Sequence, residues 1–318
     1  MTIVRVTAPG RVNLIGDHTD YTGGFVLPMI LERSTVIEGE IVEGSTITVE
    51  SADERDPVSF PVDVDDPSAL QPPWGRYVAA MVREAGSVPA FRARVTTDLP
   101  IGAGLSSSAA LEIAVARFVR EITGRTWDDV AMAEAARRAE HAASGVPCGI
   151  MDQLCIAVGR RGHATFIDCR DLTHQHVPIP ESMEVLVRFV SHRTLVGSEY
   201  ADRVADCREI ERRIGPLREA SPTAVESIDD DRLRRRARHV TSENRRVLES
   251  VEALRAGDVR AFGSLMIESH QSLARDYETS NPTMDRAVDE LLAEPGVVGA
   301  RMTGGGFGGC VVAIRSAQ

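Results

Sequence analysis

Six polar side chains lie close together near the N-terminus, on a segment that runs from residue 9 to residue 24. They fall within eleven positions and are Arg11, Asn13, Asp17, His18, Asp20 and Tyr21. Each hydroxyl group of a polyol both donates and accepts hydrogen bonds, so carboxylates and a histidine on one loop suit such a ligand. The segment therefore indicates a site for a hydroxyl-rich small molecule, and an ordinary polar loop is the alternative.

A second candidate site is the segment LPIGAGLSSSA at residues 99–109, where two glycines precede the three serines Ser106 to Ser108. Glycines let the backbone approach a ligand closely, and the exposed N–H groups of a following helix bind anions. The three hydroxyls can contact phosphate oxygens or Mg²⁺. The pattern favours a phosphate site, and a serine N-cap after a flexible turn is the alternative.

Two further segments have residue types that suit catalysis. Residues 303–310 contain five glycines in six positions, which weakens a plain hairpin unless a ligand approaches the backbone closely; a tight turn is the alternative. Glu140 and His141 lie at the end of a predicted helix, and Asp152 follows a short stretch that contains a glycine. Near a phosphate site Asp152 could hold a metal or accept a proton, and a helix cap is the alternative.

The elements that must position these residues are strands in the first third and helices in the middle. Alternating or β-branched patterns predict strands, at residues 2–8, 34–42, 45–51, 91–99, 163–172, 184–192, 296–302 and 310–314. Apolar spacing predicts helices at 74–86, 109–123 and 126–143, and helical periodicity dominates from about 193 to 293. The helix at 109–123 has Leu111, Val115, Phe118 and Ile122 on one face.

This mixture of strands and helices has no regular βαβ alternation, so we expect an α+β fold. The composition shifts towards helix near residues 170–180, which predicts one domain at 1–172 and another at 173–318. The segment 229–238, DDDRLRRRAR, favours a solvated helix with acids at its N-terminus over a basic patch.

The chain contains no lysine, because all 36 of its basic residues are arginine. This composition excludes Schiff-base and pyridoxal-phosphate lysine chemistry and a lysine general base. It also excludes a P-loop of the G-x-x-x-x-G-K-[ST] type. Any essential cation must therefore be an arginine, a histidine or a metal ion.

The remaining totals describe an acidic chain of ordinary composition. The formal net charge of −11 argues against a nucleic-acid partner. The five cysteines form no C-x-x-C pair and suit reduced thiols in a cytoplasm. The first residues lack the apolar core of a signal peptide, and no charge-free apolar run is long enough to span a bilayer. We therefore expect a cytoplasmic protein without a membrane partner.

These motifs together resemble the GHMP kinase superfamily, and within it the galactokinases. GRVNLIGDHTDYTGG is similar to the galactokinase signature, LPIGAGLSSSAALE to the ATP loop of the family, and RMTGGGFGGC to its third motif. AEHAASGVPCGIMDQ, LVGSEY and SHQSLARDYETSNP also resemble galactokinase sequence. The resemblance extends from about residue 6 to residue 315.

The resemblance implies roles for single residues. Asp152 matches the aspartate beside the anomeric hydroxyl of the sugar, and Arg11 matches the arginine that faces it. Ser108 and Glu140 match the Mg²⁺ ligands. The positions that match sugar contacts are Asp17, His18, Asp20, Gly149 and Tyr200. Those that match ATP contacts are Trp74, near the adenine, and the phosphate-loop residues Gly102, Gly104, Leu105, Ser106, Ser107 and Ser108.

The implied fold is an N-terminal domain like the second domain of ribosomal protein S5, with a ferredoxin-like C-terminal domain and the site between them. The implied activity is transfer of the γ-phosphoryl group of Mg·ATP to the anomeric hydroxyl of galactose. The sequence leaves open whether Asp152 is a true base or acts late, with Arg11 lowering the pKa of the hydroxyl. It also leaves open whether the protein is a monomer or a weak dimer.

The sequence departs from the pattern in three places, and two other functions stay open. Asp17 stands where galactokinases usually have glutamate, the N-terminal arm is nearly absent, and the region between the second and fourth strands is shorter. A kinase for an N-acetylated, 6-deoxy or pentose relative of galactose is one alternative. A non-catalytic galactose and ATP sensor is the other, although the serines, Glu140, Arg11 and Asp152 are all present. Mevalonate-kinase-like members usually have a lysine where Arg11 stands.

Overall fold

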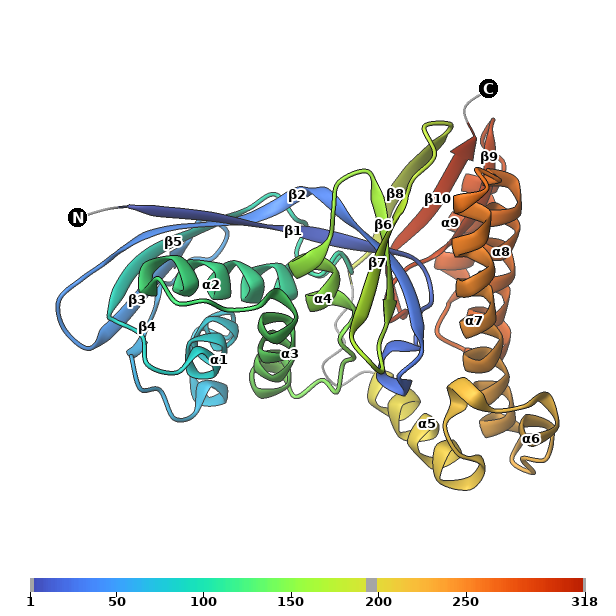
Figure 1. Ribbon diagram of the computed structural model, residues 1–318, viewed down its shortest axis with the longest axis horizontal. Helices are drawn as coiled ribbons and strands as arrows, with labels where there is room; N and C mark the ends of the chain where they lie inside the picture. Colours follow the sequence, from blue (N-terminus) through green and yellow to red (C-terminus); the bar gives the residue numbers. More distant parts are fainter. Residues whose placement is uncertain (1–2, 193–198, 317–318) are drawn as a thin grey trace. The chain divides into compact units, whose positions relative to one another are not determined.

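The computed structural model describes residues 3–192 and 199–316 (Figure 1). The chain divides into two compact units that alternate along the sequence. The first unit contains Met1–Arg11, Leu31–Ile101 and Ser106–Val158, and the second contains Val12–Ile30, Gly102–Leu105 and Gly159–Gln318. Residues 195–198 of the LVGSEY match lie outside the described residues, whereas its last residue, Tyr200, is described.

The first unit contains a mixed sheet in which β4, β3, β5 and the second half of β2 are neighbours in that order. Strand β3 runs parallel to β5, and the other two pairs are antiparallel. Every second residue of β5 is buried, as expected for a strand with one face on a core. The strand bounds are β1 Val4–Ile15, β2 Phe25–Ile41, β3 Thr46–Ser51, β4 Val58–Pro61 and β5 Phe91–Thr97.

The helices of the first unit pack against one another, as Figure 1 shows for α1, α2 and α3. Their bounds are α1 Gly75–Ala85, α2 Ser107–Thr123, α3 Asp129–Ser144 and α4 Met151–Val158. The predicted core face of α2 is partly confirmed, because Val115 and Phe118 are buried whereas Leu111 and Ile122 are only half-buried. Helix α3 ends one residue beyond the predicted helix at 126–143 and begins three residues later than predicted.

The second unit contains a three-stranded antiparallel sheet in the order β8-β10-β9. Helices α8 and α9 pack on β9, and α7 packs on α8 (Figure 1). The start of β2 also pairs with β6, and β6 pairs with β7. The remaining strands are β6 His163–Asp168, β7 Thr173–Pro178, β8 Met183–Ser191, β9 Val297–Met302 and β10 Gly309–Ser316. The helices are α5 Tyr200–Ile214, α6 Pro222–Glu226, α7 Asp231–Arg255, α8 Val259–Ser272 and α9 Pro282–Leu292.

The α+β expectation is confirmed, and most of the predicted strands and helices are present. Two strands are missing from the prediction, β4 and β7. Strand β4 alternates between buried and exposed residues, but it has only four residues and ends in proline, so the pattern is too short to predict a strand. Strand β7 buries only Val177 and has no clear apolar alternation. The solvated-helix interpretation of residues 229–238 holds for most of the segment but is wrong for Arg236, whose side chain is only 2% exposed.

The expected domain boundary between residues 172 and 173 stays a prediction. Among the described residues, no helix has both the length and the apolar character that crossing a bilayer requires.

Candidate active site

Arg11 and Asp152 form a bidentate ion pair within the first unit. Arg11 lies on β1, and Asp152 lies in the first turn of α4. The Arg11 guanidinium donates from Nε to Oδ1 of Asp152 at 2.7 Å and from Nη2 to Oδ2 at 2.6 Å. The Arg11 side chain is 3% exposed and that of Asp152 is 30% exposed. Two parallel charge-assisted hydrogen bonds fix the plane of the carboxylate and leave one edge of it near solvent.

Ser106 is a third member of this group. Its Oγ donates to Oδ2 of Asp152 at 2.5 Å. Ser106 occupies the N-cap position of α2, yet its side chain caps no backbone amide of that helix. The alternative of a plain serine cap is therefore wrong for this residue. The structure places a hydroxyl of the serine-rich loop directly on the carboxylate that the sequence selects as a proton acceptor.

The loop before α2 has the backbone geometry of an anion-binding turn. Gly102, Gly104 and Ser106 have φ values of 72°, 80° and 61°, in the left-handed region. Glycine adopts this region without a steric cost, whereas a serine there is uncommon. The loop leads into the 17-residue helix α2, whose first N–H groups have no partner within the helix. These amides and the hydroxyls of Ser107 and Ser108 can receive phosphate oxygens.

A cluster of acids lies beside the start of α2. Glu140 is hydrogen-bonded to Ser108 and to Glu112, and Glu112 accepts a hydrogen bond from Nε2 of Gln153 at 3.2 Å. Burial raises the pKa of Glu140, with a further contribution from the charge of Asp152. Burial and the neighbouring Glu140 carboxylate raise the pKa of Glu112 well above its usual range. The hydrogen bond between the two carboxyl groups therefore leaves the proton on Glu112 and the negative charge on Glu140, where a cation would offset it.

This donor set fits Mg²⁺ that arrives with a nucleotide. Mg²⁺ in phosphoryl-transfer sites is usually held by one or two carboxylates together with substrate phosphates, rather than by a cage of protein ligands. Ser108 and Glu140 supply a hydroxyl and a carboxylate side by side. Among the described residues, no group of three or more histidines, cysteines or acids has the geometry of a self-sufficient metal site.

The carboxylate of Asp17, in the second unit, is bonded to the protein on both oxygens. Oδ1 accepts from Nδ2 of Asn13 at 2.8 Å and from the N–H of Gly304 at 3.1 Å. Oδ2 accepts from Nη2 of Arg301 at 2.5 Å. The Asp17 side chain is 2% exposed and that of Arg301 is completely buried. The predicted sugar-contacting residue therefore also joins the signature segment to the third motif.

The glycine-rich third motif packs closely against protein. Thr303 donates from Oγ1 to the carbonyl of Asn13 at 2.8 Å, and the N–H of Phe307 donates to the carbonyl of Thr279 at 2.8 Å. A Cβ atom at Gly306 would lie 2.5 Å from the same carbonyl oxygen. The sequence predicts that a ligand comes close to the backbone of this motif. At Gly306 the group that comes close is the backbone of Thr279.

Glu243 supports the signature segment from α7. Its Oε1 accepts from the N–H of Gly16 at 3.0 Å and from Oγ of Ser269 at 2.6 Å, and its Oε2 accepts from Nε of Arg246 at 2.8 Å. Burial alone would raise the pKa of Glu243, but the charges of Arg246, His239 and Arg301 together lower it to about 2. The carboxylate is therefore ionised at neutral pH and balances buried guanidinium charge.

His239 makes a second contact from α7 to the same segment. Its Nε2 lies 3.2 Å from the carbonyl oxygen of Asp17, and its Nδ1 lies 2.9 Å from Oγ of Ser272. A carbonyl only accepts, so Nε2 bears a proton and Nδ1 accepts from the serine. Burial lowers the pKa of His239 to about 4, so the ring is neutral at pH 7.

His18 lies in an aromatic cluster at the turn of the signature segment. Its φ of 66° is in the left-handed region, and its ring centroid lies 5.5 Å from that of Tyr200 and 4.7 Å from that of Tyr277. Two predicted sugar-binding residues, His18 and Tyr200, are thus brought together. Tyr21 hydrogen-bonds to His18 at 2.9 Å.

The other predicted contacts lie at the ends of elements. Asp20 begins a short 3-10 helix, Asp20–Thr22, and Gly149 is buried two residues before α4. Trp74 is the N-cap of α1, where its Nε1 donates to the carbonyl of Asp56 at 3.2 Å. No bound ligand tests these three assignments, so they stay predictions.

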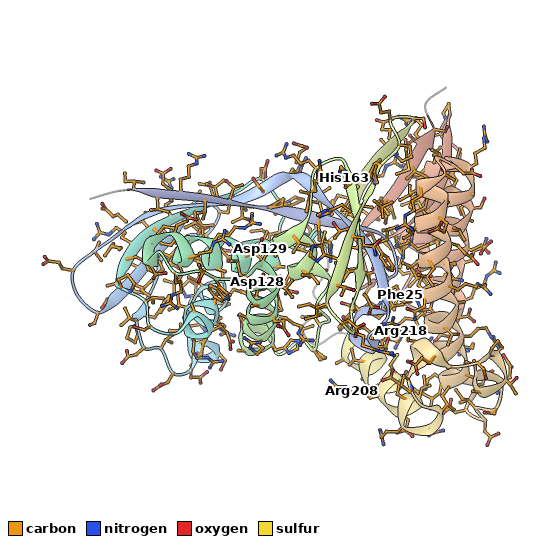
Figure 2. The ribbon with its side chains drawn as sticks, viewed as in Figure 1. Phe25, Asp128, Asp129, His163, Arg208 and Arg218 are labelled. Carbon is orange, nitrogen blue, oxygen red and sulfur yellow. The ribbon has the colours of Figure 1, made fainter. Side chains whose placement is uncertain are left out.

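The end of the signature segment is fixed by Arg218. Figure 2 labels Arg218 beside Phe25, and its guanidinium carbon lies 4.1 Å from the centroid of the Phe25 ring. Arg218 also donates to the carbonyl of Gly23 at 3.1 Å and forms a bidentate pair with Asp168, at 2.5 Å and 2.6 Å. Arg218 thus fixes the end of the signature segment at Gly23 and Phe25, and Asp168 fixes Arg218.

Sequence reasoning missed the residues that support the site. These are Glu112, Glu243, His239, Tyr277 and Arg301, which touch a predicted site residue or the signature backbone. The sequence could have indicated that Glu112 and Arg301 are buried, because each is a charged residue inside an apolar run. Glu243 and His239 lie on a strongly polar helix, where the sequence does not distinguish buried charges from solvated ones.

Three protein-family models match the chain. Residues 75–160 match the GHMP kinases N terminal domain, and residues 250–316 match GHMP kinases C terminal. Residues 2–40, which contain the signature segment, match the galactokinase galactose-binding signature. The fold and the site therefore define a kinase of the GHMP class.

Relatives that align with almost the whole chain show which family within that class it belongs to. The chain is 44% identical to galactokinase of Homo sapiens and 45% identical to galactokinase of Bos taurus. Each alignment covers 98% of this chain and 84% of the relative. The chain belongs to the galactokinase family.

Solved structures agree with this assignment. Lactococcus lactis galactokinase complexed with galactose matches with a TM-score of 0.91 and 31% identity, over 99% of this chain and 86% of the other. Methanococcus jannaschii mevalonate kinase matches with a TM-score of 0.74 and 19% identity, over 99% and 91% of the two chains. The second match concerns the fold alone.

We predict that Asp17→Asn destabilises the protein by about 3 kcal/mol, because the buried Arg301 guanidinium loses its short ion pair and keeps only the longer one, at 3.9 Å, to Glu243. Denaturant unfolding at pH 7 measures this loss. The matched control is Asp231→Asn, which removes a carboxylate that is 68% exposed and should cost less than about 1 kcal/mol. Equal stability losses in the two variants would contradict a structural role for Asp17.

We further predict that His239→Gln flattens the pH dependence of stability between about pH 6.5 and pH 4. The folded-state pKa of His239 is lowered to about 4 from an ordinary value of 6.5. As the pH is lowered from 6.5 to about 4, the unfolded state therefore binds a proton that the folded state does not bind. The free energy of unfolding decreases over this range. The glutamine amide can still donate to the Asp17 carbonyl.

The measurement compares the free energy of unfolding at pH 7 and at pH 5 in both proteins. Burial also lowers the pKa of His270, but that residue is common to both, so the difference between the profiles isolates His239. Parallel profiles would show that His239 does not titrate in this window.

Proposed function

We propose that this protein transfers the γ-phosphoryl group of ATP to the anomeric hydroxyl of galactose, giving galactose 1-phosphate and ADP. The observation that carries the proposal is the match of residues 2–40 to the galactose-binding signature, within a chain 41–45% identical to galactokinases over 98% of its length. The bidentate Arg11–Asp152 pair supports it with the charges that such a transfer needs.

In this proposal Asp152 accepts the proton of the sugar hydroxyl, and Arg11 offsets the negative charge that develops. Phosphoryl transfer depends mainly on positioning and electrostatic stabilisation, and there is little covalent chemistry for the protein to perform. The Arg11 fork fixes the carboxylate of Asp152, and Ser106 holds one of its oxygens. A sugar hydroxyl would approach the partly exposed edge of Asp152, and the contact can tighten when both substrates bind.

The loop at residues 102–108 would hold the triphosphate through glycine flexibility, helix N–H groups and serine hydroxyls. Ser108 and Glu140 would hold Mg²⁺ beside it. When bound, the ion neutralises charge on the β- and γ-phosphate oxygens. This chain therefore builds a phosphate site without the lysine that a P-loop uses. Trp74 is the proposed adenine neighbour.

The proposed sugar contacts are Asp17, His18, Asp20, Gly149 and Tyr200. For Asp17 the bonds within the protein limit this role, since its oxygens already accept from Asn13, Gly304 and Arg301. A sugar hydroxyl would have to share or replace one of these bonds. This residue is therefore where discrimination between galactose and its analogues is decided in our proposal.

We also propose a cytoplasmic protein that is a monomer or a weak dimer, with domains at 1–172 and 173–318. All five cysteines lie within the described residues and none forms a disulfide, which supports a reducing compartment.

We predict that Asp152→Asn lowers kcat with galactose and Mg·ATP by at least about 100-fold, the usual contribution of a positioned general base. The amide keeps the size of the side chain but accepts a proton poorly. A coupled assay of ADP release measures the rate, and Asp53→Asn, on an exposed turn, is the matched control. Activity near that of the wild type in Asp152→Asn would exclude Asp152 as the base.

A further inference from the structure

A continuous chain of hydrogen bonds connects His18 to a buried thiol. Nδ1 of His18 lies 2.9 Å from the hydroxyl of Tyr21, and that hydroxyl lies 2.7 Å from the hydroxyl of Tyr277. The Tyr277 hydroxyl in turn lies 3.2 Å from Sγ of Cys207. Four side chains from three distant segments of the sequence, all in the second unit, thus form one row of polar atoms.

Packing and hydrogen bonds fix the positions of the side chains in this row. Cys207 lies on α5 and Tyr277 ends a π-helical turn, Leu273–Tyr277, and both side chains are in the apolar core of the second unit. Arg203 donates from Nε to the carbonyl of Tyr277 at 2.9 Å. The Tyr277 ring also packs between the rings of His18 and His239, with centroid separations of 4.7 Å and 4.5 Å.

Each of the three groups beyond His18 keeps its proton at neutral pH. Burial is the main cause that raises the pKa values of Tyr21 and Tyr277 well above their usual range. Burial also raises the pKa of Cys207 to about 12. The row therefore contains one S–H and two O–H protons, and these protons can point in either direction along the row.

Two concerted directions are possible. In one, Cys207 donates to Tyr277, Tyr277 to Tyr21, and Tyr21 to Nδ1 of His18. In the other, Nδ1–H of His18 donates to Tyr21, Tyr21 donates to Tyr277, and Tyr277 donates to the sulfur of Cys207. A phenol is a much stronger acid than a neutral imidazole N–H, and imidazole nitrogen is a better acceptor than phenol oxygen or thiol sulfur. The first direction makes the stronger bonds, and bonds in a chain polarise one another.

We infer that Tyr21, Tyr277 and Cys207 are positioning residues that hold His18 as its Nε2–H tautomer. The hydrogen bond at one ring nitrogen decides the protonation of the other. His18 therefore presents Nε2 as a hydrogen-bond donor, suited to a hydroxyl oxygen of the sugar. The link to sugar binding rests on the proposed function, whereas the tautomer itself does not.

The test begins with ¹⁵N-histidine NMR on the full chain without ligands, with His18 assigned by the signal lost in His18→Gln. We expect a protonated Nε2 and an unprotonated Nδ1 at His18. A protonated Nδ1 would overturn the inference even if the protein is an active galactose kinase. The expected pattern in a protein that does not phosphorylate galactose would contradict the proposed function alone.

Variants then remove single links of the row. Tyr21→Phe removes the donor to Nδ1 and should give a mixture of tautomers, whereas Tyr277→Phe should give a smaller change in the same direction. Cys207→Ser keeps a donor at the end of the row and should preserve the wild-type pattern. An unchanged tautomer in Tyr21→Phe would overturn the inference.

His239 is the internal control for these spectra, because it packs on the same Tyr277 ring but takes its tautomer from the Asp17 carbonyl. Its tautomer should stay unchanged in every variant. In kinetics, Tyr21→Phe should raise the KM for galactose about three- to tenfold, the effect of one hydrogen bond, with the KM for ATP unchanged. Equal increases in both KM values would indicate general damage and would contradict a positioning role.

Discussion

The bidentate pair between Arg11 and Asp152 is the interaction on which the proposed function of this protein depends. It joins a strand to the first turn of a helix and sets a fixed positive charge against the proposed proton acceptor. A planar guanidinium fixes both oxygens of a carboxylate, which the single ammonium group of a lysine does not do. The serine loop adds Ser106 to the same carboxylate, so the proposed base and the proposed phosphate-binding loop share a direct hydrogen bond.

The signature segment depends on a different constraint, the neutralisation of buried charge. Asp17 and Glu243 offset Arg301 and Arg246, and each carboxylate also accepts a backbone N–H. These contacts hold residues 13–17 against α7 and the third motif. The methylene by which Asp17 is shorter than the usual glutamate therefore matters for the interior of the segment as much as for a bound sugar.

Much of this site could be predicted from the sequence, because its motifs are local. The serine loop, the signature segment and Asp152 are each recognisable from neighbouring residues, and the family models confirm the class that they indicate. Of the supporting residues, Glu243 and His239 could not be predicted, because burial decides their roles. Glu243 and Arg245 lie two residues apart on α7, yet Glu243 is fully buried whereas the Arg245 side chain is 68% exposed. Residues two apart point to opposite faces of a helix, but α7 is so rich in charged residues that its apolar face is weakly marked in the sequence. Strand β7 was missed for a similar reason, since it buries only one residue.

The central claim is that galactose is the sugar that this protein phosphorylates. The most direct measurement is ADP release by the wild-type protein with Mg·ATP and a panel of about ten sugars, including N-acetylated, 6-deoxy and pentose relatives of galactose. A site built for particular hydroxyls rejects analogues that lack them, so we predict a kcat/KM for galactose at least about 100-fold above that for 6-deoxy or pentose analogues. A higher kcat/KM for any analogue, or no ADP release with galactose, would contradict the account.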